Sequence, residues 1–554
     1  MSNGAAAGTA TAGSGAGAGT AASRAAAARP GAGDTEMHLS PWLISMIVVL
    51  ATFMEVLDTS IANVSLPHIA GSLAASTDES TWVLTSYLVA NAIVLPLSGW
   101  FSNVFGRKRF YMTCVVLFTA SSFLCGLAPS LPMLILFRVL QGLGGGGLQP
   151  SAQAILADAF PPEQRGMGFS VYAMAVVFAP AIGPTLGGWI TDNMNWRWIF
   201  YINVPVGIVS FVLTGALIKD PAYLVERVRQ MRGKLRIDYV GIALLTLGLG
   251  FLQVVLDKGQ EDDWFGSRLI ASSTAISALA LLGVVFWELR VSNPIVDLRL
   301  FRERNFAVSN LLIFGLGFAL FGSTVLVPQF LQTLLGYTAT ESGKVLSPGG
   351  VAVMLILPIT GALINRVGPK ALITVGLIVA GGALWMTSHI SLQVDYWTIT
   401  LYRMVVGVGI AFLFVPISTA AFSRLPPEKS NAASALFNLA RNLGASFGIA
   451  AVINLVVRQS QVHTSQLVAH ASAGSTAYNQ WIAGLSQRLI AGGSSAYEAG
   501  RQATALAART IYQQAAALAY LDAFRFVAIA CFAMLPLAWL LKKVPLGKGP
   551  VHVD

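Results

Sequence analysis

The sequence predicts an all-α polytopic membrane protein, on three observations. Hydrophobic residues make up 55% of the 554 residues and charged residues only 11%, and the mean hydropathy is +0.67. Soluble domains carry about 25% charged residues. Apolar segments of about 18–25 residues, the length that crosses a bilayer, recur along the chain. The third observation is an internal repeat, which predicts two related helical bundles.

Fourteen segments are long and apolar enough to span the membrane. They lie near residues 42–66, 81–101, 110–128, 131–156, 167–190, 198–218, 238–256, 269–288, 306–331, 345–364, 371–389, 397–422, 431–456 and 522–541. An even number of spans leaves both ends of the chain on the same side of the membrane.

Basic residues identify that side. They gather in alternate loops, at Arg107, Lys108, Arg109, Arg165, Arg227, Arg229, Arg232, Lys234, Arg236, Arg290, Arg299, Arg302, Arg304, Arg366, Lys370, Arg424, Lys429, Lys542 and Lys543. Because cytoplasmic loops carry an excess of Lys and Arg, both termini are predicted to be cytoplasmic. The net charge of +10 then reflects topology and not a nucleic-acid surface.

The terminal segments are predicted to be tails. Residues 1–40 are rich in Ala, Gly, Thr and Ser and lack the apolar core of a secretory signal, so we expect a disordered cytoplasmic tail. An organellar transit peptide is the alternative. Residues 546–554 are expected to form a second cytoplasmic tail. The three cysteines lie in apolar segments without disulfide or metal-ligand spacing, so no metal site is expected.

The chain repeats itself at a separation of about 265 residues. Three matches occur in the same order: Gly99–Lys108 with Gly361–Lys370, Arg138, Gly142 and Gly144 with Arg403, Gly407 and Gly409, and Phe160–Glu163 with Leu425–Glu428. Two six-helix bundles follow, at 41–220 and 301–545, with two extra spans between them at 221–300. Duplicated bundles with a site between them suit a transporter that works by alternating access.

Glu55 and Asp58 are the only acidic residues that we place deep inside an apolar span. A charge in hydrocarbon costs roughly 2.5–3.5 kcal/mol on insertion scales, so such a residue persists beside a protein interior, with a partner, or by binding a proton. A spacing of three puts both on one helix face. Buried acids gathered on one helix predict that protons or cations move there.

Asp58 and Arg138 are predicted to lie at similar depth, about 12 Å and about 10 Å from the outer side at 1.5 Å per residue. The guanidinium would favour the ionised carboxylate and burial would oppose it, which suits a group that titrates during transport. A static ion pair joining the two spans is the alternative. Glu55, nearer the midplane, is predicted to bind substrate or a proton; a neutral or paired structural residue is the alternative.

Five motifs together carry a resemblance to a known family. They are Leu57–Pro67, Gly99–Lys108, Arg138–Gly142, Gly183–Gly188 and Asn195–Pro205. Over about residues 40–545 the chain resembles the major facilitator superfamily, and within it the fourteen-span drug:proton antiporters of the EmrB/QacA type, closest to the EmrB branch. The resemblance implies the major facilitator fold and antibiotic resistance by multidrug efflux across a bacterial inner membrane. It also implies a periplasmic membrane-fusion adaptor and an outer-membrane channel as partners in a tripartite pump.

The resemblance also implies roles for individual residues. Arg138 and Gln141 belong to the motif linked to proton coupling, which adds them to Asp58 and Glu55. Arg403, the repeat counterpart of Arg138, is instead expected to pack its bundle. The export motif comprises Gly183, Pro184, Gly187 and Gly188, for which simple helix packing without a directional role is the alternative.

The predicted substrate-binding residues come from three spans. Gln141, Gln149 and Gln153 share one helix face through spacings of eight and four, so that face is expected to line a cavity. Arg441, near mid-depth of its span, is expected to bind an anionic substrate or to neutralise a distant acid. The predicted substrate set is Glu55, Asn63, Gln149, Gln153 and Arg441.

The loop between the second and third spans is predicted to form a cytoplasmic gate from Gly99, Asn103, Gly106 and Arg107. The superfamily usually has Asp where this chain has Asn103. A neutral Asn cannot form a charge pair, so hydrogen bonds are expected in its place. The basic residues Arg107, Lys108 and Arg109 are in any case explained by topology.

Residues 457–521 form one long segment on the outer side, rich in Ala, Gln and Ser. Tyr497–Tyr520 is predicted to be helical and to run into the final span, because good helix formers dominate it and no proline interrupts it.

The sequence therefore predicts a proton-driven multidrug efflux transporter that exports amphipathic small molecules and needs no cofactor. It has no phosphate-binding loop of an ATP motor, and no nucleophile–base or metal constellation, so we do not expect an enzyme. A proton-coupled nutrient or metabolite symporter of the same fold and a non-transporting membrane sensor remain alternatives. Few buried acids and several buried arginines favour neutral or anionic substrates, although two acids on one span still permit cations.

Overall fold

The computed structural model describes residues 40–161, 164–231, 238–291, 294–471 and 474–544. Both predicted tails therefore lie outside the described residues, as do the basic residues Arg232, Lys234 and Arg236 and the end of the Phe160–Glu163 repeat motif. The described residues of the compact unit Pro41–Asp554 form helices and no strands. The predicted all-α fold class is confirmed.

The N-terminal half comprises α1 (Pro41–Ser72), α2 (Thr77–Phe105), α3 (Arg107–Leu127), α4 (Leu131–Gly145), α5 (Leu148–Ala159), α6 (Arg165–Asn193), α7 (Trp198–Tyr201) and α8 (Asn203–Leu217). The linking segment holds α9 (Ala222–Met231), α10 (Tyr239–Lys258), η1 (Trp264–Gly266), α11 (Arg268–Arg290) and η2 (Leu298–Arg302). The C-terminal half comprises α12 (Arg304–Leu334), α13 (Ala339–Val367), α14 (Pro369–Thr387), α15 (Tyr396–Phe422), η3 (Pro427–Lys429), α16 (Ser430–His470), α17 (Thr476–Ala491), α18 (Ala496–Ala533) and α19 (Leu535–Trp539).

Thirteen helical segments of the described residues are long and apolar enough to cross a membrane. A fourteenth is α6, whose parts Arg165–Pro180 and Ile182–Asn193 meet at a bend of 44°. Proline explains the bend, because Pro180 and Pro184 lie inside this helix and each removes a backbone hydrogen bond. The predicted fourteen spans are thus confirmed.

The internal repeat is visible in how helices begin and end. Ser76 and Glu79 form a capping box at the start of α2, and Thr338 and Glu341 form the same box at the start of α13. The two helices also end alike, at a glycine with positive φ: +89° at Gly106 and +83° at Gly368. Local signals at both ends of the two helices therefore follow the duplication.

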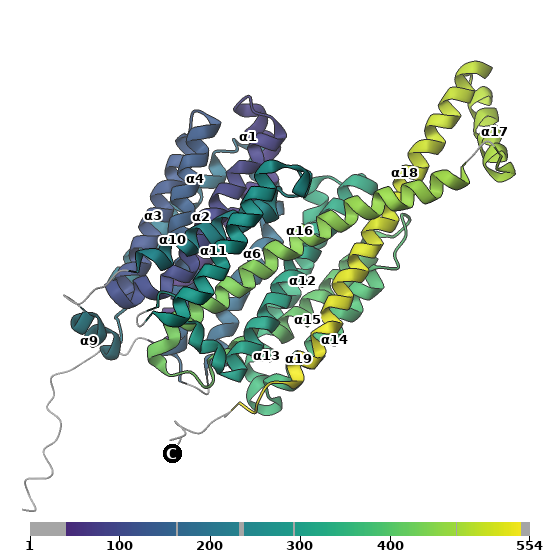
Figure 1. Cartoon of the computed structure of the whole chain (residues 1–554). Coiled ribbons are helices and arrows are strands. Elements are labelled where there is room, and N and C mark those ends of the chain that lie inside the picture. Colours follow the sequence, from purple (N-terminus) through teal and green to yellow (C-terminus); the bar gives the residue numbers. More distant parts are fainter. Residues whose placement is uncertain (1–39, 162–163, 232–237, 292–293, 472–473, 545–554) are drawn as a thin grey trace, which may run out of the picture. The chain divides into compact units, whose positions relative to one another are not determined.

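Packing follows the same repeat (Figure 1). In the N-terminal half α1 packs on α6, α2 on α4, and α3 on α4 and α8. In the C-terminal half α12 packs on α16, α13 on α15, and α14 on α15 and α18. The halves meet where α6 lies along α13 and where α2 and α5 lie along α16. The extra pair joins this interface through α10, which packs on α2, α16 and α11.

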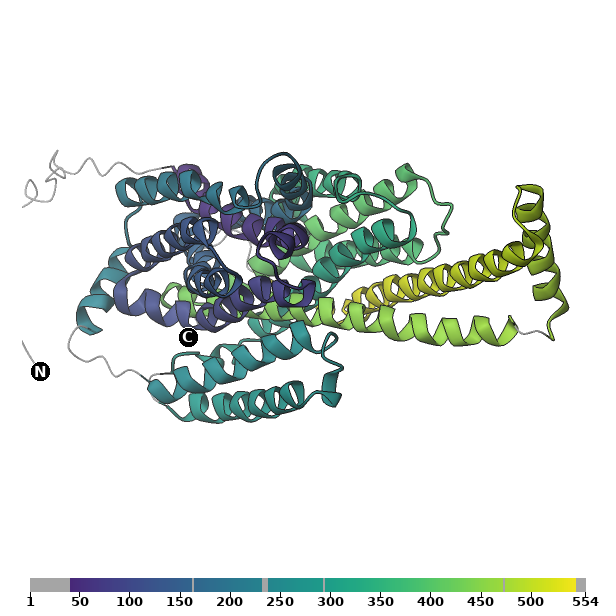
Figure 2. The same ribbon diagram turned by 90° about the horizontal axis from the view of Figure 1, so that it is seen from above.

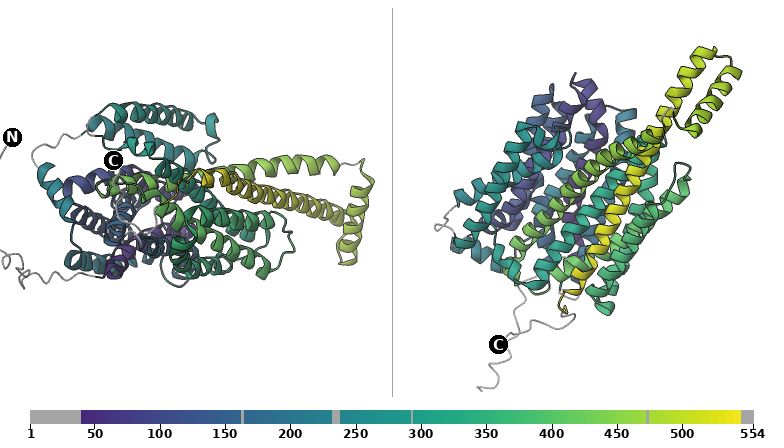
Figure 3. Two further views of the ribbon diagram at one scale, coloured as in Figure 1. Left: turned by 90° about the horizontal axis from the view of Figure 1, so that it is seen from below. Right: turned by 45° about the vertical axis from the view of Figure 1, so that its right-hand side comes forward.

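The segment 457–521 is more helical than predicted. Helix α16 continues to His470, α17 follows, and α18 runs without interruption from Ala496 into the final span. Figures 1, 2 and 3 show the far parts of α16 and α18 extending together beyond the other spans, with α17 at their tip. The predicted helix at Tyr497–Tyr520 is confirmed, and the remainder of the segment, expected as a loop, is a helical hairpin.

Candidate functional site

The carboxylate of Asp58 on α1 accepts hydrogen bonds from side chains of α4 and α8. Its Oδ2 accepts from Nη1 of Arg138 at 2.5 Å, and its Oδ1 accepts from the side-chain amides of Gln141 at 3.0 Å and Asn203 at 2.7 Å. Arg138 is 0% exposed and Asp58 2% exposed. Both charges are therefore removed from solvent together, and the contact that the depth argument predicted is present.

The guanidinium of Arg138 is held on several sides. Its Nε donates to the Val83 carbonyl at 3.0 Å, its Nη1 also donates to Oε1 of Gln141 at 2.8 Å, and it lies 4.4 Å from the centre of the Tyr87 ring. Losing either member of a buried ion pair leaves an uncompensated charge, which is strongly unfavourable. The carboxylate of Asp58 is therefore the counter-charge that holds the Arg138 guanidinium of α4 in place.

Glu55 forms a second cluster one helical turn away. Its Oε1 accepts from the Tyr87 hydroxyl at 3.1 Å and from the Asn91 amide at 3.2 Å, and its Oε2 accepts from the amide of Gln149 on α5. Gln149 in turn accepts a hydrogen bond from Arg441 on α16. Glu55 is thereby connected to the C-terminal half, and Tyr87 contacts both acidic clusters.

Arg441 is buried, with 3% exposure, and only part of its guanidinium is satisfied. Its Nη2 donates to Gln149 and, at 3.1 Å, to Asn442. Its Nε and Nη1 have no hydrogen-bond partner among the described residues. Two donors without a hydrogen bond of normal geometry are unusual, because buried donors are nearly always satisfied, and the Tyr172 hydroxyl is the neighbour that interacts with this guanidinium.

Gln153 and Asn63 lie outside this cluster. Gln153 accepts from Asn438 of α16 at 2.6 Å, and Asn438 accepts from the Tyr172 hydroxyl at 3.0 Å, so this glutamine also lies between the two halves. Asn63 is exposed on α1 and makes no side-chain hydrogen bond among the described residues. The structure therefore brings Glu55, Gln149 and Arg441 together and leaves Asn63 apart.

Four functional neighbours were not singled out from the sequence: Tyr87, Asn91, Asn203 and Asn438. Each is a polar side chain in a mostly apolar segment. Tyr87 and Asn91 are spaced by four on α2, and Asn203 stands in the Asn195–Pro205 motif. Such spacing is a usable signal, because polar groups in spans need a buried partner.

Two acids near helix ends are shielded as well, although the sequence places only Glu55 and Asp58 deep inside a span. Glu288 near the end of α11 is 1% exposed, and Asp257 near the end of α10 has a carboxylate oxygen that is fully shielded. Both belong to the extra helix pair and stand within three residues of a helix end. Neighbouring helices, rather than depth along the span, bury them.

The export motif lies just beyond the bend of α6, at close helix contacts. A Cβ at Gly183 would stand 2.2 Å from Oγ of Ser60 on α1, and one at Gly187 would stand 3.0 Å from Ile61. Gly188 faces α13 instead, with Thr340 at 3.6 Å. Gly183 thus has no space for a Cβ, Gly187 would accept one only if Ile61 shifted, and Gly188 has space for one, so the motif packs α6 between α1 and the C-terminal half.

The predicted gate residues meet the C-terminal half at the start of α16. Gly99 lies against the backbone of Asn431 and Ala432, and the Asn431 amide donates to Oδ1 of Asn103 at 2.9 Å. The expected hydrogen bond in place of a charge pair is thus present. Gly106 supplies the positive φ that turns the chain from α2 into α3.

Arg107 corrects the interpretation of the basic loop. It is 1% exposed and therefore not a surface charge explained by topology alone. It donates to Asp158 of α5 at 2.7 Å and to Oδ1 of Asn431 at 2.7 Å. A buried ion pair therefore joins this loop to α5 and, through Asn431, to the other half.

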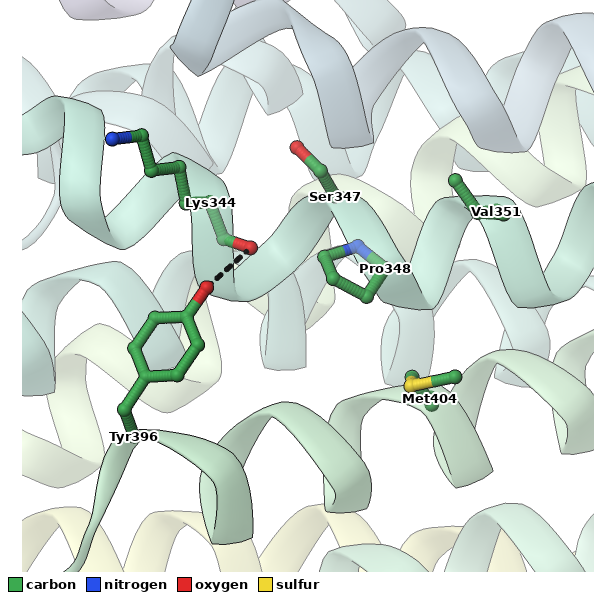
Figure 4. A pocket seen from close by; sticks show the side chains of 6 residues that line it. All are labelled: Lys344, Ser347, Pro348, Val351, Tyr396 and Met404. Carbon is green, nitrogen blue, oxygen red and sulfur yellow. Dashed lines mark hydrogen bonds between the residues drawn. The ribbon is translucent and has the colours of Figure 1, made fainter.

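Two hollows lie away from the predicted site residues. One is a narrow hollow of about 20 Å³ between the halves, lined by Val177, Pro180, Leu320, Thr324, Gly349, Gly350, Val353, Arg403, Gly407 and Ile410. The other, in Figure 4, lies between α13 and α15, where the Tyr396 hydroxyl donates to the Lys344 carbonyl at 3.3 Å. Arg403 lines the first hollow and donates to Ser323 at 3.0 Å and Thr324 at 2.7 Å.

Comparison with known proteins agrees with this architecture. Residues 48–449 match the family described as Major Facilitator Superfamily. The chain belongs to the major facilitator superfamily. Two solved members show the same fold: the human organic anion transporter MFSD10, at a TM-score of 0.55 and 14% identity over 90% of this chain and 99% of that one, and the proton:xylose symporter XylE, at 0.53 and 17% identity over 88% and 96%.

Curated members of the superfamily are similar over most of their length. "Multidrug export protein EmrB" of Haemophilus influenzae is 41% identical over 77% of this chain and 83% of its own. "Probable multidrug resistance protein EmrY" of Escherichia coli is 36% identical over 92% and 96%, and "Fatty acid resistance protein FarB" of Neisseria gonorrhoeae is 35% identical over 90% and 96%. The predicted resemblance to the EmrB branch is confirmed, and the chain is a multi-pass membrane transporter.

Proposed function

We propose that this protein exports amphipathic small molecules in exchange for protons, as the inner-membrane part of a multidrug efflux pump. The observation that carries the proposal is the pair of acids on one face of α1. Asp58 is bonded to Arg138, and Glu55 is bonded through Gln149 to Arg441 in the opposite half. The names of the EmrB and EmrY relatives support multidrug export.

Proton coupling rests on Asp58, Glu55, Arg138 and Gln141. A proton on Asp58 would cancel the charge that holds Arg138 and would change its hydrogen bonds to α4 and α8. Loss of that proton would restore the pair. Because no cofactor is needed for such a cycle, the proton gradient supplies the free energy in this proposal, and the protein is not an enzyme.

Substrate binding is proposed at Glu55, Gln149 and Arg441, between the halves. The two unpartnered donors of Arg441 suit a carbonyl or an anionic group, which supports neutral or anionic amphiphiles. A substrate that bonds to Arg441 would displace Gln149 and change the environment of Glu55. Substrate and proton would then compete through shared hydrogen bonds, as exchange requires.

The location and partners follow from the same proposal. The basic loops support cytoplasmic termini in a bacterial inner membrane, and the EmrB names support that membrane. The hairpin of α16, α17 and α18 would extend on the periplasmic side, where a membrane-fusion adaptor and an outer-membrane channel would complete the pump (Figure 3). Deleting the hairpin tip should impair extrusion only where adaptor and channel are present.

Transport in proteoliposomes with an imposed pH gradient tests the proposal. The parent should accumulate a lipophilic weak acid against its gradient, with proton flux in the opposite direction. Asp58→Asn and Glu55→Gln should lose this uphill movement. Accumulation by both variants would disprove the coupling assignment. Flux of substrate and protons in the same direction would indicate a symporter, and no flux at all would indicate a sensor.

A further inference from the structure

The extra helix pair carries a polar cluster that the proposed transport steps do not use. At the end of α10, Gln253 donates to Oδ1 of Asp257 at 2.9 Å and accepts from the hydroxyl of Ser446 on α16 at 3.1 Å. Lys258 donates to the hydroxyl of Thr81 on α2. One end of α10 is therefore hydrogen-bonded to a helix of each half, at the interface where α2 and α16 meet.

Asp257 is the unusual member of this cluster. Its Oδ2 is shielded from solvent and makes no hydrogen bond that meets normal geometry, although the Thr85 hydroxyl of α2 lies beside it. Among the described residues Asp257 forms no ion pair, since Lys258 pairs with Glu261 at 2.5 Å. A shielded carboxylate with one unsatisfied oxygen is costly, whereas a neutral carboxyl can donate its proton to a hydroxyl.

The charges around Asp257 do not offset this cost. The charged groups that face it are Lys258 and Glu261, which belong to its own segment and oppose each other. Helix α2 contributes hydroxyls at Thr81 and Thr85, and α16 contributes only the hydroxyl of Ser446. The charges of Lys258 and Glu261 cancel, so they do not compensate a carboxylate at Asp257.

We propose that Asp257 is a second proton-binding site, whose bound proton keeps α10 joined to both halves. When the proton leaves, the shielded Oδ2 needs a hydrogen-bond donor, and water that supplies it enters beside Thr85, between α10 and α2. The loss of the proton therefore loosens this end of the interface. The proton site and the junction of α10 with the two halves are features of the fold. Only their effect on transport rests on the proposed function.

Amide hydrogen exchange of the full chain in lipid nanodiscs tests the inference. Parent and Asp257→Asn are compared at equal pH, so that the intrinsic pH dependence of exchange cancels. At acidic pH the two should agree over residues 79–90 of α2. At basic pH the parent should exchange about tenfold faster than Asp257→Asn, in which the neutral amide preserves the junction.

Two further variants complete the test. Gln253→Met removes the bond to α16 and should exchange fast at both pH values. Asp262→Asn removes the same charge from the adjacent loop and should behave as the parent does. Equal exchange of parent and Asp257→Asn at basic pH, or an equal slowing by Asp262→Asn, would overturn the proposal.

These experiments distinguish failure of this inference from misfolding of a variant and from failure of the proposed function. Misfolding of Asp257→Asn would speed exchange, which is opposite to the expected change. A failed proteoliposome assay would refute proton-coupled export and leave the exchange result intact. The converse result is proton-coupled export that depends on Asp58, together with no pH-dependent difference in hydrogen exchange between parent and Asp257→Asn. That result would refute only the second proton site.

Discussion

The two halves place an arginine at the same point of the fold but give it different partners. In the N-terminal half, Nη1 of Arg138 donates to the carboxylate of Asp58 at 2.5 Å. In the C-terminal half, Nη1 of Arg403 donates to the hydroxyl of Ser323 at 3.0 Å. Each residue of the second pair follows its counterpart by 265 residues, so a serine occupies the place of the acid.

The aromatic neighbour differs as well. The ring of Tyr87 stacks on Arg138, whereas Gly349 occupies the corresponding place on α13, beside the stem of Arg403. The C-terminal half thus has neither the acid nor the ring, and the hollow lined by Gly349 and Arg403 lies there. One arginine forms a closed, charge-paired site, and the other lines a space. The duplicated scaffold therefore places a charge-paired arginine in one half and, in the other, an arginine beside a hollow of about 20 Å³, the size of about one water molecule.

The largest difference should appear in transport. Asp58→Asn should abolish uphill export in proteoliposomes, because an amide cannot exchange a proton. Ser323→Ala removes the hydrogen bonds of the hydroxyl to Arg403 and to the Leu320 carbonyl, each worth about 1 kcal/mol, and should slow export by less than about tenfold. Uphill rates of both variants are measured under one imposed pH gradient. Similar losses in the two variants would mean that the acid has no special role.

The next largest difference should appear in the free energy of unfolding when either arginine is replaced. Arg138→Met leaves Asp58 buried without its counter-charge and should lower the free energy of unfolding by about 3–5 kcal/mol. Arg403→Met removes a cation that has no acidic partner among the described residues, so it should cost less than about 1 kcal/mol or stabilise. Denaturant titration in mixed micelles measures both. A larger loss in Arg403→Met would show that its hydroxyl contacts outweigh its burial.

Sequence reasoning found the Asp58–Arg138 contact because two charges in apolar spans have few possible partners and helix rise fixes their depth. It could not find Asn203 or Tyr87, since a neutral polar side chain in a span can bond to many groups. Arg107 was misjudged for a related reason. Arg107 stands in a run of basic residues with Lys108 and Arg109, and such a run is expected in a cytoplasmic loop. Only the fold shows that Asp158 lies beside Arg107.

The fold itself was more predictable than the site. Span number and the helix entering the last span follow from apolar length and helix propensity, which are local properties, and the repeat follows from three motif matches along the chain. The helical continuation of α16 to His470 was missed, because the polar composition after residue 456 resembles a loop when read alone. The shielding of one Asp257 oxygen was missed because it depends on Thr85 of α2, and a contact between two helices is not local.

An acid introduced at position 323 should give the arginine site of the C-terminal half the ion pair of the N-terminal half. Ser323→Asp places a carboxylate beside Arg403, where it should form the pair seen at Arg138. A double-mutant cycle with Arg403→Met should give a favourable coupling of about 0.5–3 kcal/mol in the free energy of unfolding. Coupling near zero would show that the space left by Gly349 lets water screen the pair.

The smallest difference should lie at the glycines that end α2 and α13. Both adopt φ and ψ values open only to glycine, +89° and 143° at Gly106 and +83° and 154° at Gly368, so alanine should cost about 1–3 kcal/mol at either position. Gly106→Ala should cost about 1 kcal/mol more, because its Cβ would stand 2.9 Å from Oδ2 of Asp220, whose Oδ1 caps Lys108. Nothing lies within 4 Å of a Cβ at Gly368. Denaturant titration of the two variants side by side compares the loops. Equal losses of stability would show that the Asp220 side chain moves away from the new Cβ without cost. The two loops would then differ only in the contacts that Arg107 makes.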